Sequence, residues 1–258
     1  MSQRYTFGDN DRAAARLTLL AQVYEPSTRA LLESIGVRPV EAAVDLGCGP
    51  GYSTELLHAA LGSRETWGID RSERLVERAR ARRGPPLQFA VGDVTVAPMP
   101  GPRFNVAYGR HLLAHLASPR DVLVACAESA RPGAKLILEE TASLDSADPL
   151  FVGYYARVSA LQRHYGQDTF VGARLDRFAA DTPWVVERFE LTALEIAARS
   201  MARLHAENAR TWGDDAYARI AFDAREMAAM IEGLDEVAAG VRGAPPVRCG
   251  LGQLVLRK

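Results

Sequence analysis

Val44-Asp45-Leu46-Gly47-Cys48-Gly49-Pro50-Gly51 joins an apolar strand to a turn dense in glycine, with an acid just inside the strand end. Such a strand-to-helix turn is typical of a site for a nucleotide-like cofactor. The third glycine falls one position too early for the G-x-G-x-x-G fingerprint of dinucleotide-binding proteins, and Tyr52 occupies the expected position. No Lys-Ser/Thr pair follows, as a P-loop would require. The spacing therefore disfavours both a dinucleotide and a nucleoside triphosphate.

Outward from this turn, short apolar runs alternate with amphipathic stretches from about residue 42 to residue 141. This alternation predicts βαβ units and a parallel sheet covered on both faces. The expected strands are 42–47, 65–70, 87–92, 104–109, 134–140, 183–191 and 247–256. The expected helices of this part are 52–61, 72–83 and 119–130.

The pattern D-x-G-x-G-x-G resembles the first motif of the class I S-adenosylmethionine-dependent methyltransferases. Three further segments resemble that family in register. Strand-like 65–70 ends in an acid, Asp70, nineteen residues after Gly51. Segment 89–94 resembles the family's third strand with its acid, and 131–138 resembles the turn into its fifth strand. The resemblance covers roughly residues 40 to 141.

The resemblance implies an α/β fold: a Rossmann-like, doubly wound, seven-stranded sheet, mostly parallel, with an antiparallel last strand beside the fifth and a helical cap. From the pattern along the chain we expect N-terminal cap helices at 1–35, a cofactor-binding core at 36–144 and the remainder of the core sheet at 171–193 and 241–258. Segments 145–170 and 194–240 do not fit the core and are expected to form cap insertions. Pro26 is expected to break the N-terminal helical stretch 11–35.

The implied cofactor is S-adenosylmethionine, with S-adenosylhomocysteine as product. The Asp70 carboxylate would accept both ribose hydroxyls, and Asp93 would bind the adenine amino group. Cys48 is better explained as a small residue packed under the cofactor than as a nucleophile. The expected cofactor contacts are Asp45, Gly47, Cys48, Gly49, Gly51, Asp70, Arg71, Gly92, Asp93, Val94, Gly109 and Arg110.

Methyl transfer is an in-line displacement, so the protein mainly aligns the reactants and excludes water. A base is informative if present, but a carbon acceptor does not require one before transfer. Candidates follow the fourth strand, because open parallel sheets bind ligands beyond their carboxyl ends. The expected catalytic residues are His111, His115 and Tyr24. If 111–116 is helical, His111 and His115 share a face and could form a metal-binding pair. The sequence has no H-E-x-x-H signature and no nearby acidic ligand, so no metal is expected.

Other titratable groups have open roles. Glu139 and Glu140 end the fifth strand and serve either substrate binding or a helix cap or ion pair. His58 and His205, each alone on a predicted helix, are expected to be structural or surface residues. Aromatic residues outside the core strands either line an apolar pocket or pack between cap helices. The expected substrate contacts are Tyr5, Phe7, Tyr24, His111, Tyr154 and Tyr155.

These features predict methyl transfer to a small aromatic or apolar metabolite at carbon, oxygen or nitrogen, as in bacterial secondary-metabolite enzymes. The first alternative is a protein of this fold that binds the cofactor but catalyses a rearrangement or cyclisation. An RNA methyltransferase is less favoured, because the net charge is −1 and basic residues are scattered apart from Arg78–Arg83, expected to be a solvated helix end.

The composition indicates the class of protein, its cellular compartment and its partners. With 48% hydrophobic and 24% charged residues among 258, the chain is typical of a globular protein, and disorder or membrane spanning is not expected. Three widely spaced cysteines favour a reducing compartment, and the charged N-terminus lacks a signal-peptide pattern. We expect a cytoplasmic monomer or homodimer with a small-molecule substrate and neither nucleic acid nor membrane as partner.

Overall fold

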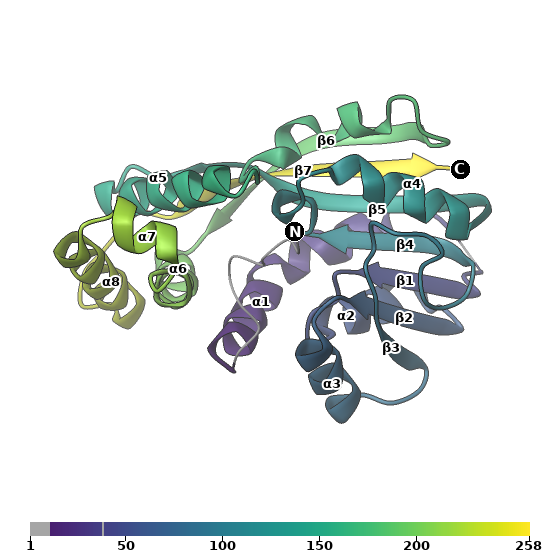
Figure 1. Cartoon of the computed structure of the whole chain (residues 1–258), viewed down its shortest axis with the longest axis horizontal. Coiled ribbons are helices and arrows are strands. Elements are labelled where there is room, and N and C mark those ends of the chain that lie inside the picture. The colour runs from purple at the N-terminus through teal and green to yellow at the C-terminus, as the bar shows by residue number, and fades with distance from the viewer. Residues whose placement is uncertain (1–10, 38) are drawn as a thin grey trace.

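Seven strands form the central sheet of the computed structural model, which describes residues 11–37 and 39–258. The strands are β1 (Ala42–Leu46), β2 (Glu65–Asp70), β3 (Leu87–Val91), β4 (Phe104–Arg110), β5 (Ala130–Asp145), β6 (Val185–Ile196) and β7 (Val247–Arg257). Their order is β3-β2-β1-β4-β5-β7-β6 (Figure 1). Strands β1 to β5 pair in parallel, and β7 runs antiparallel to both β5 and β6. The expected sheet with an antiparallel last strand is confirmed.

Eight α-helices and two 3-10 segments connect the strands within the described residues. The α-helices are α1 (Asp11–Glu33), α2 (Tyr52–Leu61), α3 (Glu73–Arg82), α4 (Pro119–Ser129), α5 (Pro149–His164), α6 (Ala198–Trp212), α7 (Ala216–Ala221) and α8 (Ala224–Ala239). The 3-10 segments are η1 (Leu113–His115) and η2 (Val171–Ala179). Helices α2, α3 and α4 lie where the apolar periodicity predicts them.

Strands β5, β6 and β7 extend well beyond the other four and reach under helices α5 to α8 (Figure 1). Strand β5 therefore overruns its predicted range 134–140 at both ends. The cap helices bury Tyr154 and Trp212 against Cys249 and Leu251 of β7. This continuous apolar contact fixes the cap on the sheet.

Helix α1 is continuous through Pro26, so the prediction of a break there is wrong. Proline costs one backbone hydrogen bond and a steric clash inside a helix. Burial on both sides of Pro26 compensates, because Tyr24 packs into the cap cluster while Leu31 and Leu32 pack beneath the sheet with Leu57. Each fully buried side chain of this kind contributes about 1.5–3 kcal/mol.

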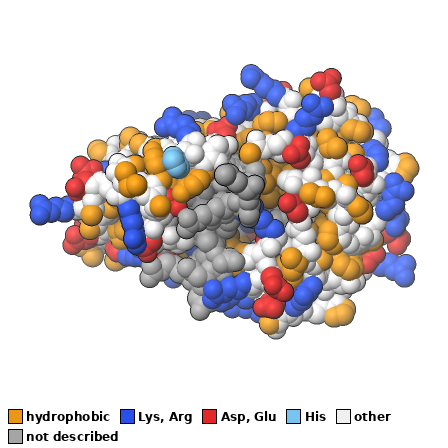
Figure 2. Space-filling model, viewed as in Figure 1, with side chains coloured by type: hydrophobic (Ala, Val, Ile, Leu, Met, Phe, Trp, Pro, Cys, Tyr) orange, Lys and Arg blue, Asp and Glu red, His pale blue; other side chains and the backbone are white. Residues whose placement is uncertain are grey.

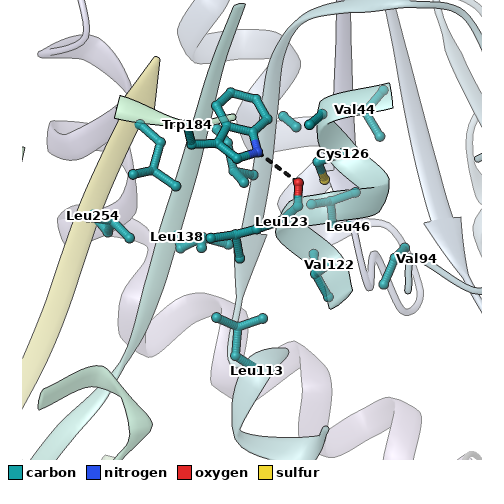
Figure 3. Close-up of a cluster of buried hydrophobic side chains, with 14 of the residues drawn as sticks. Val44, Leu46, Val94, Leu113, Val122, Leu123, Cys126, Leu138, Trp184 and Leu254 are labelled. Carbon is teal, nitrogen blue, oxygen red and sulfur yellow. Dashed lines mark hydrogen bonds between the residues drawn. The ribbon is translucent and has the colours of Figure 1, made fainter. Parts of the chain in front are cut away.

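The main core lies between the sheet and helix α4. Trp184 covers it, and its indole N–H donates to the Leu123 carbonyl at 2.7 Å, so the one polar atom of the ring is satisfied (Figure 3). Leu138 and Leu254 belong to the same buried cluster as this ring. Segment 171–179, expected within the core sheet, instead forms η2, whose Leu175 is buried in the cluster.

Charged side chains of both signs are interspersed over the face of the molecule seen in Figure 2. Among the described side chains of this face, positive and negative charges are mixed rather than gathered into the continuous cationic surface typical of nucleic-acid binding. Within the described residues, no helix combines the length and apolar character needed to cross a bilayer.

Candidate active site

A cavity of about 1140 Å³ opens at the carboxyl ends of strands β1 to β4. Its floor includes residues that follow each of these strands, and its other walls come from helices α1, α5 and α6. Cavities that hold small molecules typically measure ~300–1000 Å³, so this volume suits a cofactor together with a small second ligand. The position agrees with the rule that open parallel sheets bind ligands beyond their carboxyl ends.

The glycine turn forms one wall of the cavity through Gly47 and Gly49. Its backbone is fixed by hydrogen bonds from the N–H groups of Gly47 and Cys48 to the Ile69 carbonyl of β2, at 2.8 and 3.0 Å. Gly47 has a φ of 70°, and a Cβ atom there would lie 3.0 Å from Leu112. A larger residue would therefore strain the turn and crowd the wall.

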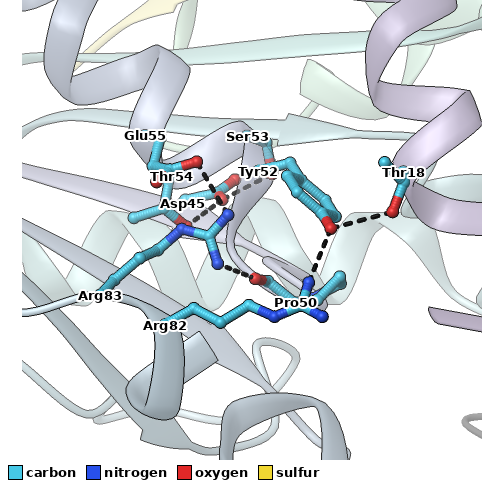
Figure 4. Close-up of polar contacts among 9 residues, drawn as sticks. All are labelled: Thr18, Asp45, Pro50, Tyr52, Ser53, Thr54, Glu55, Arg82 and Arg83. Atoms are coloured by element: carbon cyan, nitrogen blue, oxygen red, sulfur yellow. Dashed lines mark hydrogen bonds and ion pairs between the residues drawn. The ribbon is translucent and has the colours of Figure 1, made fainter. Parts of the chain in front are cut away.

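Arginines at the end of α3 support the turn from behind (Figure 4). The Arg83 guanidinium donates to the Pro50 carbonyl at 2.6 Å and pairs with Glu55 at 2.8 Å, and its side chain is only 5% exposed. Arg82 and Thr18 of α1 both donate to the Tyr52 hydroxyl at 2.9 Å. The expectation of a solvated basic helix end is therefore wrong for Arg83, whose contacts depend on the fold rather than on its own helix.

Two acids face the cavity after β2 and β3. Asp70 accepts from the backbone N–H of Gly49 at 2.9 Å and from that of Ser72 at 2.8 Å, one bond to each carboxylate oxygen. Asp93 accepts from the Thr95 backbone N–H at 2.9 Å and from its hydroxyl at 2.6 Å. Both carboxylates are thereby oriented at the cavity wall, and a carboxylate oxygen can accept from hydroxyl or amino donors. Arg71, Gly92, Val94 and Arg110 line the same cavity.

Four expected cofactor contacts lie away from the cavity lining, namely Asp45, Cys48, Gly51 and Gly109. Asp45 accepts from the hydroxyls of Ser53 and Thr54, at 2.7 and 2.6 Å, and burial raises its pKa to about 6. Cys48 packs against Phe89 in a small buried cluster. These two residues support the turn from inside the protein.

His111 lies at the end of β4 with a φ of 49°, in the left-handed region. Histidine tolerates this conformation better than most side chains, though at some cost. Its backbone N–H donates to the Glu139 carbonyl at 3.0 Å. The imidazole lines the cavity, and among the described residues its buried Nε2 has no hydrogen-bond partner. The ring of Tyr24 contacts it edge-on, with centroids 4.7 Å apart.

His115 joins His111 on the cavity wall, although 111–116 is not one helix as considered from sequence. Burial lowers the pKa of both imidazoles, and the nearby Arg16 and Arg71 guanidinium groups help to lower that of His115 to about 3. A positive charge from Arg110 further lowers the pKa of His111. Both rings are therefore uncharged at neutral pH, so each can accept a proton.

The two glutamates that end the core part of β5 have structural partners. Glu140 accepts from the backbone N–H groups of Leu112 and Leu113, at 2.7 and 2.6 Å, and so caps η1. Burial raises its pKa to about 8. Glu139 accepts from Thr28 of α1 at 2.5 Å and from Tyr108 at 2.9 Å. From sequence, the two glutamates could serve either substrate binding or a structural role. The contacts support the structural role, in which Glu140 caps η1 and Glu139 anchors α1.

The cap side of the cavity is lined by aromatic, aliphatic and amide side chains. Tyr24 and Tyr154 lie there as expected, whereas Tyr155 is buried behind the wall and bonds His205. Tyr5 and Phe7 lie outside the described residues. His58 is a structural residue, as expected, and bonds Thr66 at 3.2 Å.

Sequence reasoning missed several polar residues of the wall, among them Arg16, His205 and Asn208. Arg16 is buried and donates to the Asn208 side chain at 3.1 Å, which ties α1 to α6. The spacing of positions 201, 204, 205 and 208 in α6 places them on one helical face. This spacing could have indicated that His205 and Asn208 lie on a shared wall. That face lines the cavity in the structure.

Comparison with known proteins gives a family and a fold. Residues 43–133 match the family described as "Methyltransferase domain". Trans-aconitate 2-methyltransferase of Rhizobium meliloti is 31% identical over 147 residues, 52% of this chain and 56% of that protein. A protein encoded in a transposon of Streptomyces fradiae is 32% identical over 165 residues, 60% of this chain and 47% of its own length. The chain thus spans about half the length of the curated relatives it matches.

A solved structure extends the likeness beyond the matched segment. The crystal structure of the cyclase SpnF aligns with a TM-score of 0.60 at 18% identity, covering 92% of this chain and 82% of the other. At this level of identity the likeness concerns the fold alone.

Proposed function

We propose that the protein transfers a methyl group from S-adenosylmethionine to a small-molecule acceptor. The premise is that residues 43–133 belong to the class I S-adenosylmethionine-dependent methyltransferases. One observation carries this proposal. A single cavity joins Asp70 and Asp93 at the strand ends to the imidazole of His111 and the cap helices. Such a cavity offers room for donor and acceptor side by side with water largely displaced.

The cavity residues fit the cofactor. Asp70, whose two oxygens are each oriented by a backbone N–H, suits the two ribose hydroxyls of an adenosine. Asp93 suits the adenine amino group, because Thr95 holds its carboxylate toward the cavity edge. Gly47 suits close approach of a ligand, since a Cβ atom would crowd this wall.

When bound, S-adenosylmethionine supplies a methyl group made electrophilic by a sulfonium. The chain has to hold an acceptor in line with that group and remove a proton where the acceptor is oxygen or nitrogen. His111 is the first candidate for the second task, because its imidazole is uncharged, its Nε2 has no hydrogen-bond partner among the described residues, and its backbone conformation holds the ring against Tyr24. His115 is the second candidate base.

The walls favour a small aromatic or apolar acceptor. Tyr24, Tyr154, Val158 and Met201 offer flat and aliphatic surface on the cap side. A polymer would need an open groove, whereas helices α1, α5 and α6 each contribute residues to the wall of this cavity. A carboxylate acceptor is the second candidate, favoured by relatives named for trans-aconitate and by Arg16 and Arg110 in the wall.

Calorimetric titration with S-adenosylmethionine, S-adenosylhomocysteine and NAD is the first test. Micromolar binding of S-adenosylmethionine and S-adenosylhomocysteine, without binding of NAD, supports the cofactor assignment. If neither S-adenosylmethionine nor S-adenosylhomocysteine binds, the assignment is contradicted. Transfer of a labelled methyl group with stoichiometric formation of S-adenosylhomocysteine then separates methylation from the rearrangement or cyclisation alternative, which would leave the cofactor intact. An RNA methyltransferase would instead bind RNA with an affinity that falls steeply with salt.

A further inference from the structure

Aromatic rings hold His205 of α6 in a fixed orientation at the cap end of the cavity. Its imidazole stacks on the Tyr154 ring, with centroids 4.1 Å apart and planes at 17°. Phe151 and Tyr155 contact it edge-on, at 6.0 and 5.2 Å. The Tyr155 hydroxyl bonds Nε2 at 3.1 Å. The ring therefore has one hydrogen-bonding edge satisfied and three aromatic neighbours.

The other nitrogen of His205, Nδ1, is unsatisfied within the part of the chain that the structure describes. Among residues 11–37 and 39–258, nothing hydrogen-bonds Nδ1, although the atom is buried and the side chain is 4% exposed. Leaving a buried polar group unpaired is costly, so such groups normally have a partner. His205 lines the cavity, where a bound ligand would supply such a partner.

His205 has no acidic partner among the described residues. Burial is the cause of its lowered pKa of about 3, with no contribution from a charged neighbour among the described residues. The three acids of the described lining, Asp70, Asp93 and Asp121, follow β2 and β3 or lie on α4, at the cofactor side. An ammonium beside His205 would lose its hydration without gaining a counter-charge from these acids.

We propose that His205 Nδ1 is a recognition point for a neutral hydroxyl group at the end of the acceptor remote from the transferred methyl. This inference rests on the proposed function and names the acceptor class. A hydroxyl both donates and accepts, so it pairs with Nδ1 whichever nitrogen of the neutral ring carries the proton. A ring or chain joined to that hydroxyl lies along Val158, Met201 and Leu204 of the same wall.

A matched set of probes tests the inference in the protein saturated with S-adenosylhomocysteine. Naphthalene, naphthol, naphthoate and naphthylmethylamine share one body and differ in the polar group. In the wild type, naphthol should bind about tenfold tighter than naphthalene, which is the effect of one net hydrogen bond. Naphthylmethylamine, whose ammonium would have no counter-charge there, should bind more weakly than naphthol. Equal affinities for naphthol and naphthalene, tightest binding of a charged probe, or no binding of naphthol would overturn the inference.

His205→Phe keeps a flat ring and removes both nitrogens. In this variant naphthol should lose its tenfold advantage while naphthalene and S-adenosylhomocysteine bind as before. His164→Phe is the control, because His164 also stacks on a tyrosine of the cap, Tyr217 at 4.0 Å, but does not line the cavity. It should bind all probes like the wild type. A naphthol preference that persists in His205→Phe contradicts the assignment.

Two further measurements keep the outcomes distinct. Imidazole nitrogen NMR of the wild type should show one of the five histidines shifting with naphthol but not with naphthalene, and this readout does not depend on the variant folding. Repeating the probe titrations without S-adenosylhomocysteine separates the two proposals. In the wild type, failure to bind the cofactor alone would contradict the proposed function. Absence of a naphthol preference in the wild type alone would contradict the role of His205.

Discussion

The ring of Tyr24 meets the imidazole of His111 edge-on, with centroids 4.7 Å apart and planes at 68°. Tyr24 belongs to α1 and its hydroxyl contacts the Cys249 sulfur at 3.4 Å, so the helix, the end of β4 and β7 meet at this point. The contact limits the rotation of His111, whose backbone already occupies the left-handed region. An imidazole held in this way needs little reorganisation before accepting a proton.

Replacing His111 by asparagine tests this role. Asparagine tolerates the positive φ, so the turn should persist. If His111 is the general base, turnover should fall about 10²-fold while S-adenosylmethionine binds with unchanged affinity. Single-turnover kinetics and calorimetry measure the two quantities, with His164→Asn as control. Near-normal turnover would assign His111 to packing or indicate a carbon acceptor.

The pH profile gives a second measurement on the same residue. The pKa of His111 is lowered well below 6.5, chiefly by burial, so the base stays unprotonated as the pH falls through that value. Turnover should therefore not decline with a midpoint near 6.5. A decline centred there that is absent from His111→Asn would mean that the imidazole is solvated in the working enzyme.

Asp70→Ala should weaken cofactor binding by about 1–3 kcal/mol, the range for loss of a charged hydrogen bond. Asp70→Asn is the matched variant, because its amide oxygen still accepts one of the two backbone N–H bonds and helps to keep the turn in place. Calorimetry with S-adenosylhomocysteine measures both variants. Unchanged affinity in Asp70→Ala would remove the ribose assignment.

Arg83→Met should lower the free energy of unfolding by about 1–3 kcal/mol, because the Pro50 carbonyl and Glu55 lose a buried partner. Cofactor affinity should fall as well, since Pro50 belongs to the glycine turn. Arg82→Met serves as control: its exposed guanidinium bonds only the Tyr52 hydroxyl among the contacts in Figure 4, and the change should stay within about 0.5 kcal/mol. Equal losses in both variants would contradict a special role for Arg83.

Glu140→Gln should alter how stability depends on pH. Burial raises the folded-state pKa of Glu140 from 4.5 to about 8, so the folded protein keeps this proton to a higher pH than the unfolded chain does. The contribution of Glu140 is therefore largest at low pH and is lost as the pH rises toward 8. Glutamine stays neutral and can still accept from Leu112 and Leu113. Denaturant unfolding should show the variant gaining stability relative to the wild type as the pH rises; a constant difference would contradict the raised pKa.

The sequence places the glycine turn, Asp70, Asp93 and His111 at one edge of a predicted sheet, and all four line the cavity. This succeeds because residues that follow parallel strands meet at the same edge. Asp45 and Cys48 belong to the same motif, yet they face the interior and bond or pack behind the turn. Motif membership alone could not separate the residues that face the cavity from those that support it.

The order of apolar runs and glycines by itself determined the strands, their core helices and the location of the turn, because these depend on local periodicity and backbone sterics. Only the tertiary structure decided that α1 continues through Pro26, that Arg83 is buried, and that His205 faces the cavity. Each of these depends on contacts between segments far apart in the chain, as for Tyr155 and His205 or Arg16 and Asn208. Packing energy from such contacts outweighs local preference, and no short window of sequence contains both partners.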